Sequence, residues 1–128
     1  MRLPSTADVI PLTGGLRLGI GGVMLARPGL LGAVLGMDRA TARRSGWLAQ
    51  MIAGRELALG MGTLVSGRQG GARPWLAGQM IADSVDAVAL ALAIRAKAVH
   101  PLLAGAVVGV AGLAIAAEAA AWRAAARP

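Results

Sequence analysis

The sequence predicts an all-α membrane protein: a bundle of four transmembrane helices, with a short interfacial helix between spans one and two. Of its 128 residues, 56% are hydrophobic and only 15% are charged. Most charges lie in short clusters between apolar stretches, each close to the ~20 residues that a bilayer-spanning helix needs. The three tryptophans fall at the ends of these stretches, where the headgroup region favours indole rings. We expect residues 1–128 to form one membrane domain.

The first predicted span covers about residues 9–26. Arg17 lies inside its apolar region, which argues against a cleaved signal peptide. Pro28 breaks the chain after this span, because proline cannot continue a helix. The following segment, 29–37, is apolar but too short to cross a bilayer. We expect it to form an interfacial or partly re-entrant helix.

The second predicted span covers about residues 46–66. Asp38 is a plausible N-cap for a helix that begins at Arg39 and enters the membrane near Trp47. The glycine-rich segment 66–71 then supplies a flexible turn.

The third and fourth predicted spans cover about residues 75–94 and 102–121. Pro74 suits the first turn of the third span, and Trp75 marks its start. Trp122 closes the fourth span, also at the headgroup level.

Small residues at helical spacing favour close packing between these spans. The spacing of four appears in Gly15 with Gly19, in Gly105 with Gly109, and in the 54–62 segment. Such residues let helix backbones approach each other in lipid.

The formal net charge of +7 does not predict a nucleic-acid partner. The basic residues flank apolar stretches, where cations prefer lipid headgroups, and no Phe or Tyr is present to stack on bases. The lack of cysteine excludes disulfides and thiol catalysis. We expect no metal and no cofactor, and we expect the protein to lie in a bacterial plasma membrane. The cluster of Arg39, Arg43 and Arg44 is a topological anchor or a site for anionic lipid.

Five charged side chains lie near the middle of predicted spans, where each costs roughly 2.5–3.5 kcal/mol on insertion scales. They are Arg17 in the first span, Arg55 and Glu56 in the second, and Asp83 and Asp86 in the third. We expect both arginines to pair with carboxylates of the third span, because a guanidinium group satisfies two oxygens and keeps its charge. One carboxyl then lacks a cation and must be protonated, ligand-bound or hydrated. All five are candidate catalytic residues, the acids as acid or base and the arginines as oxygen-holding or structural cations.

Polar side chains near these charges are candidate ligand-binding residues. Gln79, Asp83 and Asp86 are spaced i, i+4, i+7 on one stripe of the third span. Thr63 shares a face with the glutamate of the second span, and Thr13 lies one turn before the arginine of the first. We therefore add Gln79, Thr13 and Thr63 to the candidate site.

The fourth span is expected to be the uncharged wall of the cluster. Its one acid, Glu118, lies near Trp122 and Arg123, where an interfacial salt bridge would suffice. Two aspartates three residues apart resemble a metal pair, but neighbouring arginines and the absence of a nearby histidine oppose a cation site.

Three strings in this chain resemble a family of small, uncharacterised four-helix membrane proteins that are abundant in high-GC actinobacteria. They are AGRELALG at 53–60, AGQMIADSVDA at 77–87, and RLG at 17–19 followed by RP at 27–28. The chain is also remotely similar to DoxX-like proteins. The resemblance implies a four-helix bundle and points to the same five charged residues, and it brings no established activity.

Three functional classes remain open from the sequence. The first is a membrane protein whose charge cluster binds a lipophilic small molecule, a lipid or a membrane partner. The second is an acid–base enzyme acting on a lipophilic substrate by epoxide opening, isomerisation or hydrolysis. The third is a small proton-linked transporter, which at four spans would need to be a homo-oligomer. The same charges also serve a purely structural role if they only fix helix register.

Overall fold

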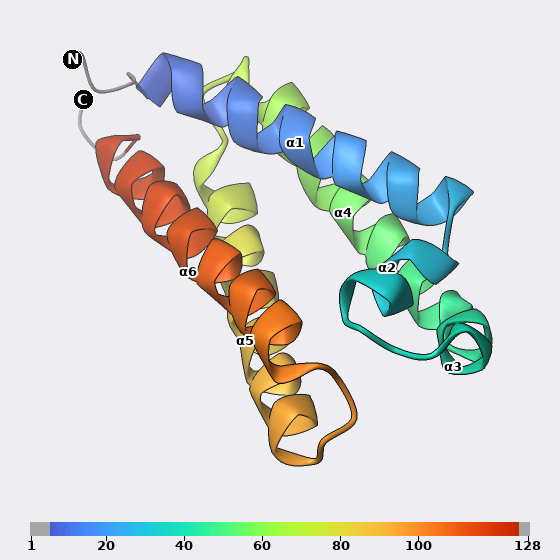
Figure 1. Ribbon diagram of the computed structural model, residues 1–128. Coiled ribbons are helices and arrows are strands. Elements are labelled where there is room, and N and C mark those ends of the chain that lie inside the picture. The colour runs from blue at the N-terminus through green and yellow to red at the C-terminus, as the bar shows by residue number, and fades with distance from the viewer. Residues whose placement is uncertain (1–5, 126–128) are drawn as a thin grey trace.

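The computed structural model describes residues 6–125, which form six helices joined by short connections (Figure 1). In chain order they are α1 (Thr6–Ala26), α2 (Gly29–Val34), α3 (Arg39–Arg44), α4 (Gly46–Gly67), α5 (Arg73–Arg95) and α6 (Pro101–Ala124). This part of the chain contains no strand, so the protein is all-helical.

Three of the four long helices are long and apolar enough to cross a membrane. They are α1 over Val9–Ala26, α5 over its whole length and α6 over its whole length. α4 has 22 residues, which is long enough, but it is not among these candidate spans. The structure thus supports three spans directly. Whether α4 is a fourth span depends on how its charged side chains are paired.

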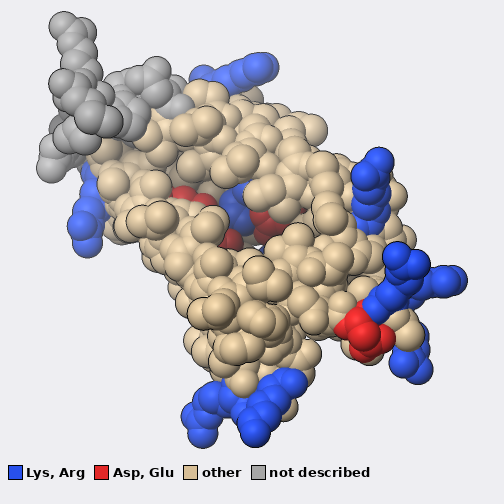
Figure 2. Space-filling model, viewed as in Figure 1, with Lys and Arg blue, Asp and Glu red and all other residues tan. Residues whose placement is uncertain are grey.

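The charges lie where a membrane protein would place them. On the face shown in Figure 2, basic side chains gather at the ends of the long helices, and the helix sides between them are uncharged. Large apolar side chains are exposed along these sides, including Leu16 on α1, Ile81 on α5 and Leu113 on α6, which are 61%, 66% and 74% exposed. Such a continuous apolar exterior is suited to contact with lipid tails.

The tryptophans lie at helix ends. Trp47 is the second residue of α4, and Trp75 lies in the first turn of α5. Trp122 lies in the last turn of α6, where Arg73 of α5 stands over its ring at 4.1 Å from the centroid. This cation–π contact joins the first turn of α5 to the last turn of α6.

The connection between α1 and α4 differs from the single helix that we expected to begin at Arg39. Asp38 is indeed the N-cap, since its Oδ1 accepts hydrogen bonds from the backbone N–H groups of Ala40 and Thr41, both at 3.0 Å. However, α3 ends at Arg44, and α4 begins separately after Ser45. The Ser45 hydroxyl donates to the Thr41 carbonyl at 2.9 Å, a local bond of the kind that competes with helix continuation.

The long helices associate as two pairs. α1 packs along α4, which we call the first helix pair, and α5 packs along α6, the second helix pair (Figure 1). The two pairs touch each other much less, through α4 with α5 and α1 with α6.

Glycines bring the backbones of the first helix pair together. A Cβ atom added to Gly60 would lie 2.7 Å from the Gly14 carbonyl oxygen, and one added to Gly21 would lie 3.0 Å from the Ala53 carbonyl oxygen. The expectation that Gly15 and Gly19 serve this purpose is wrong, because a Cβ at either position meets nothing within 4 Å. The rotation of α1 about its axis decides which glycines face α4, and spacing alone does not reveal it.

Candidate functional site

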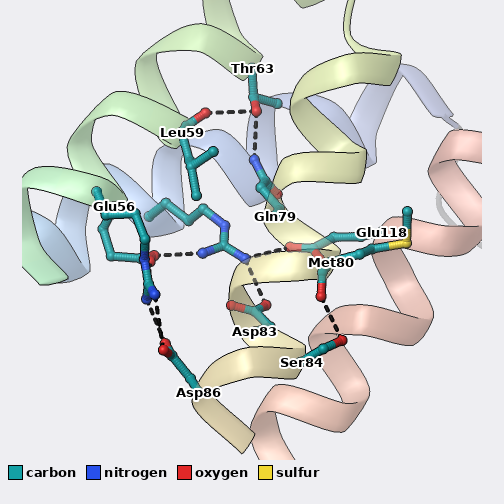
Figure 3. A network of polar contacts seen from close by, with 11 residues as sticks. Glu56, Leu59, Thr63, Gln79, Met80, Asp83, Ser84, Asp86 and Glu118 are labelled. Atoms are coloured by element: carbon teal, nitrogen blue, oxygen red, sulfur yellow. Dashed lines mark hydrogen bonds and ion pairs between the residues drawn. The ribbon is translucent and has the colours of Figure 1, made fainter.

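Arg17 is the centre of a buried ion-pair network that links all four long helices (Figure 3). Its Nη1 donates to Glu56 Oε2 of α4 at 2.7 Å. Its Nη2 donates to Asp83 Oδ2 of α5 at 2.6 Å and to Glu118 Oε1 of α6 at 2.8 Å. The Arg17 side chain is only 7% exposed, so these contacts replace almost all of its hydration.

Arg55 forms a second, more open centre of the network. Its Nη1 and Nη2 bind the two carboxylate oxygens of Asp86 at 2.9 and 2.5 Å, a bidentate pair between α4 and α5. Its Nη2 also contacts Glu56 Oε1 at 3.2 Å, so Glu56 bridges the two arginines. The side chains of Arg55 and Asp86 are 31% and 36% exposed, which makes this the accessible edge of the network. Each arginine therefore pairs with an aspartate of α5, as the sequence predicted.

Two of the three predicted ligand-binding side chains meet, and the third lies apart. Gln79 Nε2 donates to Thr63 Oγ1 at 2.5 Å, and Thr63 donates in turn to the Leu59 carbonyl at 2.8 Å. Both side chains are fully buried. Thr13 donates to the carbonyl of Ile10 on its own helix at 3.1 Å, so its one recorded bond does not reach the network.

Glu118 belongs to the network, and the expectation of an interfacial salt bridge with an uncharged fourth span was wrong. The residue is 1% exposed, and its side-chain partner is Arg17 of α1. One sequence signal pointed inward: Trp122, which marks the headgroup level, follows Glu118 by one helical turn. Glu118 therefore lies on the membrane side of that tryptophan.

The network holds more acid than base. Four carboxylates (Glu56, Asp83, Asp86 and Glu118) contact two guanidinium groups, which leaves a formal charge of minus two. Two buried acceptor oxygens, Glu118 Oε2 and Gln79 Oε1, and one buried donor, Arg55 Nε, have no hydrogen-bond partner. A buried acceptor without a donor costs ~1–3 kcal/mol, more when the group is charged. The arrangement is therefore suited to receive hydrogen-bond donors and positive charge.

The network lies below a hollow in the molecular surface. Figure 2 shows acidic and basic atoms at the bottom of an opening between the first and second helix pairs, and the rim of this opening is uncharged on the face drawn. Within residues 6–125, no group of histidine, aspartate and glutamate side chains has an arrangement that would hold a metal ion.

Comparisons of the chain with family models, with curated proteins and with solved structures gave no match. The resemblance to the actinobacterial four-helix family and to DoxX-like proteins therefore stays a prediction.

Proposed function

We propose that the protein is an integral membrane protein with four spans, and that its charge network binds a lipophilic small molecule with a positively charged hydrogen-bond donor. A long-chain ammonium compound represents this class. The observation that carries the proposal is the combination of two excess formal negative charges with two unpartnered buried oxygens.

The fourth span in this proposal is α4. Its 22 residues correspond to ~33 Å at 1.5 Å per residue, enough to cross the hydrocarbon core. Its two charges lower its hydropathy, but both are paired toward other helices, Glu56 with Arg17 and Arg55 with Asp86. Glu56 is buried in the bundle, and Arg55, although 31% exposed, is paired with Asp86, so both charges are compatible with a membrane-spanning helix.

The unpartnered acceptor oxygens indicate which headgroup the ligand carries. An ammonium group carries three donors and a full positive charge, so it can supply donors to Glu118 Oε2 and Gln79 Oε1 and offset part of the excess charge. A neutral alcohol supplies a donor without the charge. A carboxylate or phosphate would add to the negative charge, which the buried acids disfavour.

The apolar surroundings of the network indicate that the ligand carries an apolar chain. The network lies between two helix pairs that contact each other sparingly, and the helix sides around the opening are uncharged (Figure 2). An amphiphile in the bilayer would therefore reach the acids laterally, with its chain remaining among apolar side chains.

Four probes of equal chain length test this proposal: dodecylamine, dodecyltrimethylammonium, dodecanol and dodecanoate. Each is added below its micellar concentration to the purified protein in a non-ionic detergent, and the Tm is measured at neutral pH. We expect dodecylamine to raise the Tm by several degrees, because a ligand that binds only the folded state stabilises it. The quaternary amine, which lacks N–H donors, should give less, and dodecanoate should give nothing. Equal shifts for all four probes would show a surfactant effect and contradict the proposal.

Matched variants locate the effect. Glu118→Gln removes one excess charge from the network and should reduce the dodecylamine shift. Asp38→Asn removes the same charge from an exposed helix cap and keeps an oxygen for the capping bonds, so it should leave the shift unchanged. A loss of the same size in both variants would argue against binding at the network.

A second candidate is an acid–base enzyme on a lipophilic substrate. The specific observation is that Asp83 and Glu118 accept hydrogen bonds from the same nitrogen of Arg17, at 2.6 and 2.8 Å. Two adjacent carboxyls of different exposure can act as acid and base in a single proton transfer. Conversion of 1,2-epoxydodecane to its diol, followed by mass spectrometry, tests this candidate. Asp83→Asn should abolish turnover, whereas Asp38→Asn should retain it.

A further inference from the structure

A second concave site lies outside the network, in the bend that connects α1 to α4. It is an open cavity of about 550 Å³. Three arginines line it: Arg27 after α1, and Arg39 and Arg43 of α3. Its apolar wall includes Leu30 and Ala33 of α2 and Met37. We call this the elbow cavity.

The arginines of the elbow cavity form no ion pair within the described structure, and one acid, Asp38, lies beside them. Among residues 9–125, no ion pair involves Arg27, Arg39 or Arg43. The nearest acid in the sequence, Asp38, uses its oxygens elsewhere. Its Oδ1 accepts from two backbone N–H groups of α3, and its Oδ2 accepts from the Thr41 hydroxyl at 2.5 Å. The three guanidinium groups are thus free to bind an anion.

The elbow cavity lies at the level expected for lipid headgroups. The candidate span of α1 ends at Ala26, directly before Arg27. α2, with the sequence GLLGAV, is entirely apolar yet only six residues long, and its Leu30 and Val34 are 42% and 45% exposed. A short helix with exposed apolar side chains beside basic residues is suited to lie in the membrane interface. Figure 2 shows several basic side chains and one acidic patch gathered at this end of the molecule.

We propose that the elbow cavity binds the headgroup of an anionic phospholipid. The guanidinium groups of Arg27, Arg39 and Arg43 hold the phosphate, whose oxygens match the planar fork of arginine. The glycerol and the first carbons of an acyl chain lie against Leu30, Ala33 and Met37. The pairing of three free cations with an apolar wall selects an amphiphile over a free ion. A zwitterionic headgroup is disfavoured, because its own cation would be repelled.

This inference depends on the position of α1 in a membrane and not on the ligand of the charge network. It also goes beyond the general attraction of basic residues to anionic membranes, because it assigns binding to one side of α3. Arg43 lines the elbow cavity, whereas its neighbour Arg44 does not. Both residues are exposed and both lie in the last turn of α3, so they form a matched pair.

Native mass spectrometry of the purified full chain tests the proposal. Palmitoyl-oleoyl phosphatidylglycerol, palmitoyl-oleoyl phosphatidylcholine and glycerol-3-phosphate are added separately to the protein in non-ionic detergent, and the bound fraction is titrated. We expect phosphatidylglycerol to bind at least tenfold more tightly than phosphatidylcholine, and glycerol-3-phosphate not to displace it. Arg43→Gln should weaken phosphatidylglycerol binding roughly fivefold, the contribution typical of one basic residue near an anionic lipid surface. Arg44→Gln should change it less than twofold.

A triple variant, R27Q/R39Q/R43Q, should remove the preference for phosphatidylglycerol, while R68Q/R95Q/R123Q, which loses the same charge elsewhere, should keep it. Three outcomes would overturn the proposal. Equal affinity for the two lipids would show no headgroup selection. Equal losses in the Arg43 and Arg44 variants would show a diffuse surface effect, and displacement by glycerol-3-phosphate would indicate a site for a soluble phosphate ester. If the triple variant does not fold, the comparison of Arg43→Gln with Arg44→Gln still tests the proposal.

Discussion

The contact within the first helix pair and the contact between the two pairs are built on different physical principles. α1 and α4 meet through glycines whose backbones nearly touch, as at Gly14 and Gly60. The first and second pairs meet through ion pairs, from Arg17 to Asp83 and Glu118 and from Arg55 to Asp86. Lipid tails are as apolar as leucine, so burial of apolar surface drives neither contact. Close backbone packing distinguishes the first contact, which also includes the Arg17–Glu56 ion pair, whereas the second contact depends mainly on ion pairs.

The charges are also divided unequally between the pairs. The first helix pair supplies both arginines and Glu56, whereas the second supplies only acids to the network. The second pair would therefore carry three unpaired carboxylates into the membrane if it separated from the first. The ion pairs thus join the two helix pairs, and the acids of the second pair create the excess negative charge from which we infer ligand binding.

The largest expected effect is the loss of the central cation. Arg17→Leu removes the one group that three buried carboxyls share, and breaking a buried ion pair costs about 3–5 kcal/mol. The free energy of unfolding, measured in non-ionic detergent by denaturant titration, should fall by that amount. Arg123→Leu, an exposed arginine at the end of α6, is the control and should change it by less than ~1 kcal/mol. A stable Arg17→Leu variant would mean that the pairs associate without the network.

The second largest effect is expected from a variant that forces the backbones of α1 and α4 apart. Gly60→Ala places a Cβ atom 2.7 Å from the Gly14 carbonyl oxygen, so the helices must separate, at a cost of about 1–3 kcal/mol. Gly54→Ala on the same helix meets nothing within 4 Å and should be neutral or slightly stabilising. Thermal unfolding of the two variants in detergent measures the difference. Similar Tm values would show that α1 and α4 are not in close contact.

A smaller effect is expected at the open edge of the network. Asp86→Asn weakens the bidentate pair with Arg55, but both side chains are about one-third exposed, so the loss should be about 1 kcal/mol or less. Comparison with Asp83→Asn, whose side chain is 13% exposed, tests whether burial sets the size of the effect. The Asp83 variant should lose more stability in the same unfolding assay. A larger loss in the Asp86 variant would show that the Arg55–Asp86 pair contributes more to stability than the Arg17–Asp83 pair.

The smallest effect lies outside both contacts, at the cap of α3. Hydrogen bonds from the Thr41 hydroxyl and the backbone lower the pKa of Asp38 below its usual value. A group with a lowered folded pKa stabilises the fold above its unfolded pKa of ~3.9, and this contribution is lost as the pH falls through the folded value. Hydrogen exchange at the Ala40 and Thr41 amides should therefore be slowed by the cap at neutral pH and lose that protection in acid. Asp38→Ala should remove this protection at every pH and leave that of α4 unchanged.

Much of this architecture is local and follows from the sequence alone. Helices end or begin near Pro28, Pro74 and His100, because proline has a fixed φ and no N–H group and is therefore disfavoured in the interior of a helix. The cap at Asp38 reflects hydrogen bonds within one turn. The pairing of each arginine with an aspartate of α5 was also predictable, because isolated charges at mid-span have few alternatives.

Other features were decided only by the tertiary structure. The sequence could not place Glu118 on Arg17, because the 101 residues between them fix neither the depth nor the rotation of α6 relative to α1. For the same reason it could not tell which glycines bring α1 against α4. Nor could it show which buried oxygens remain without donors, since that depends on every neighbouring helix at once. Helical spacing determined which side chains share a face, whereas the packing of four helices determined what each face meets.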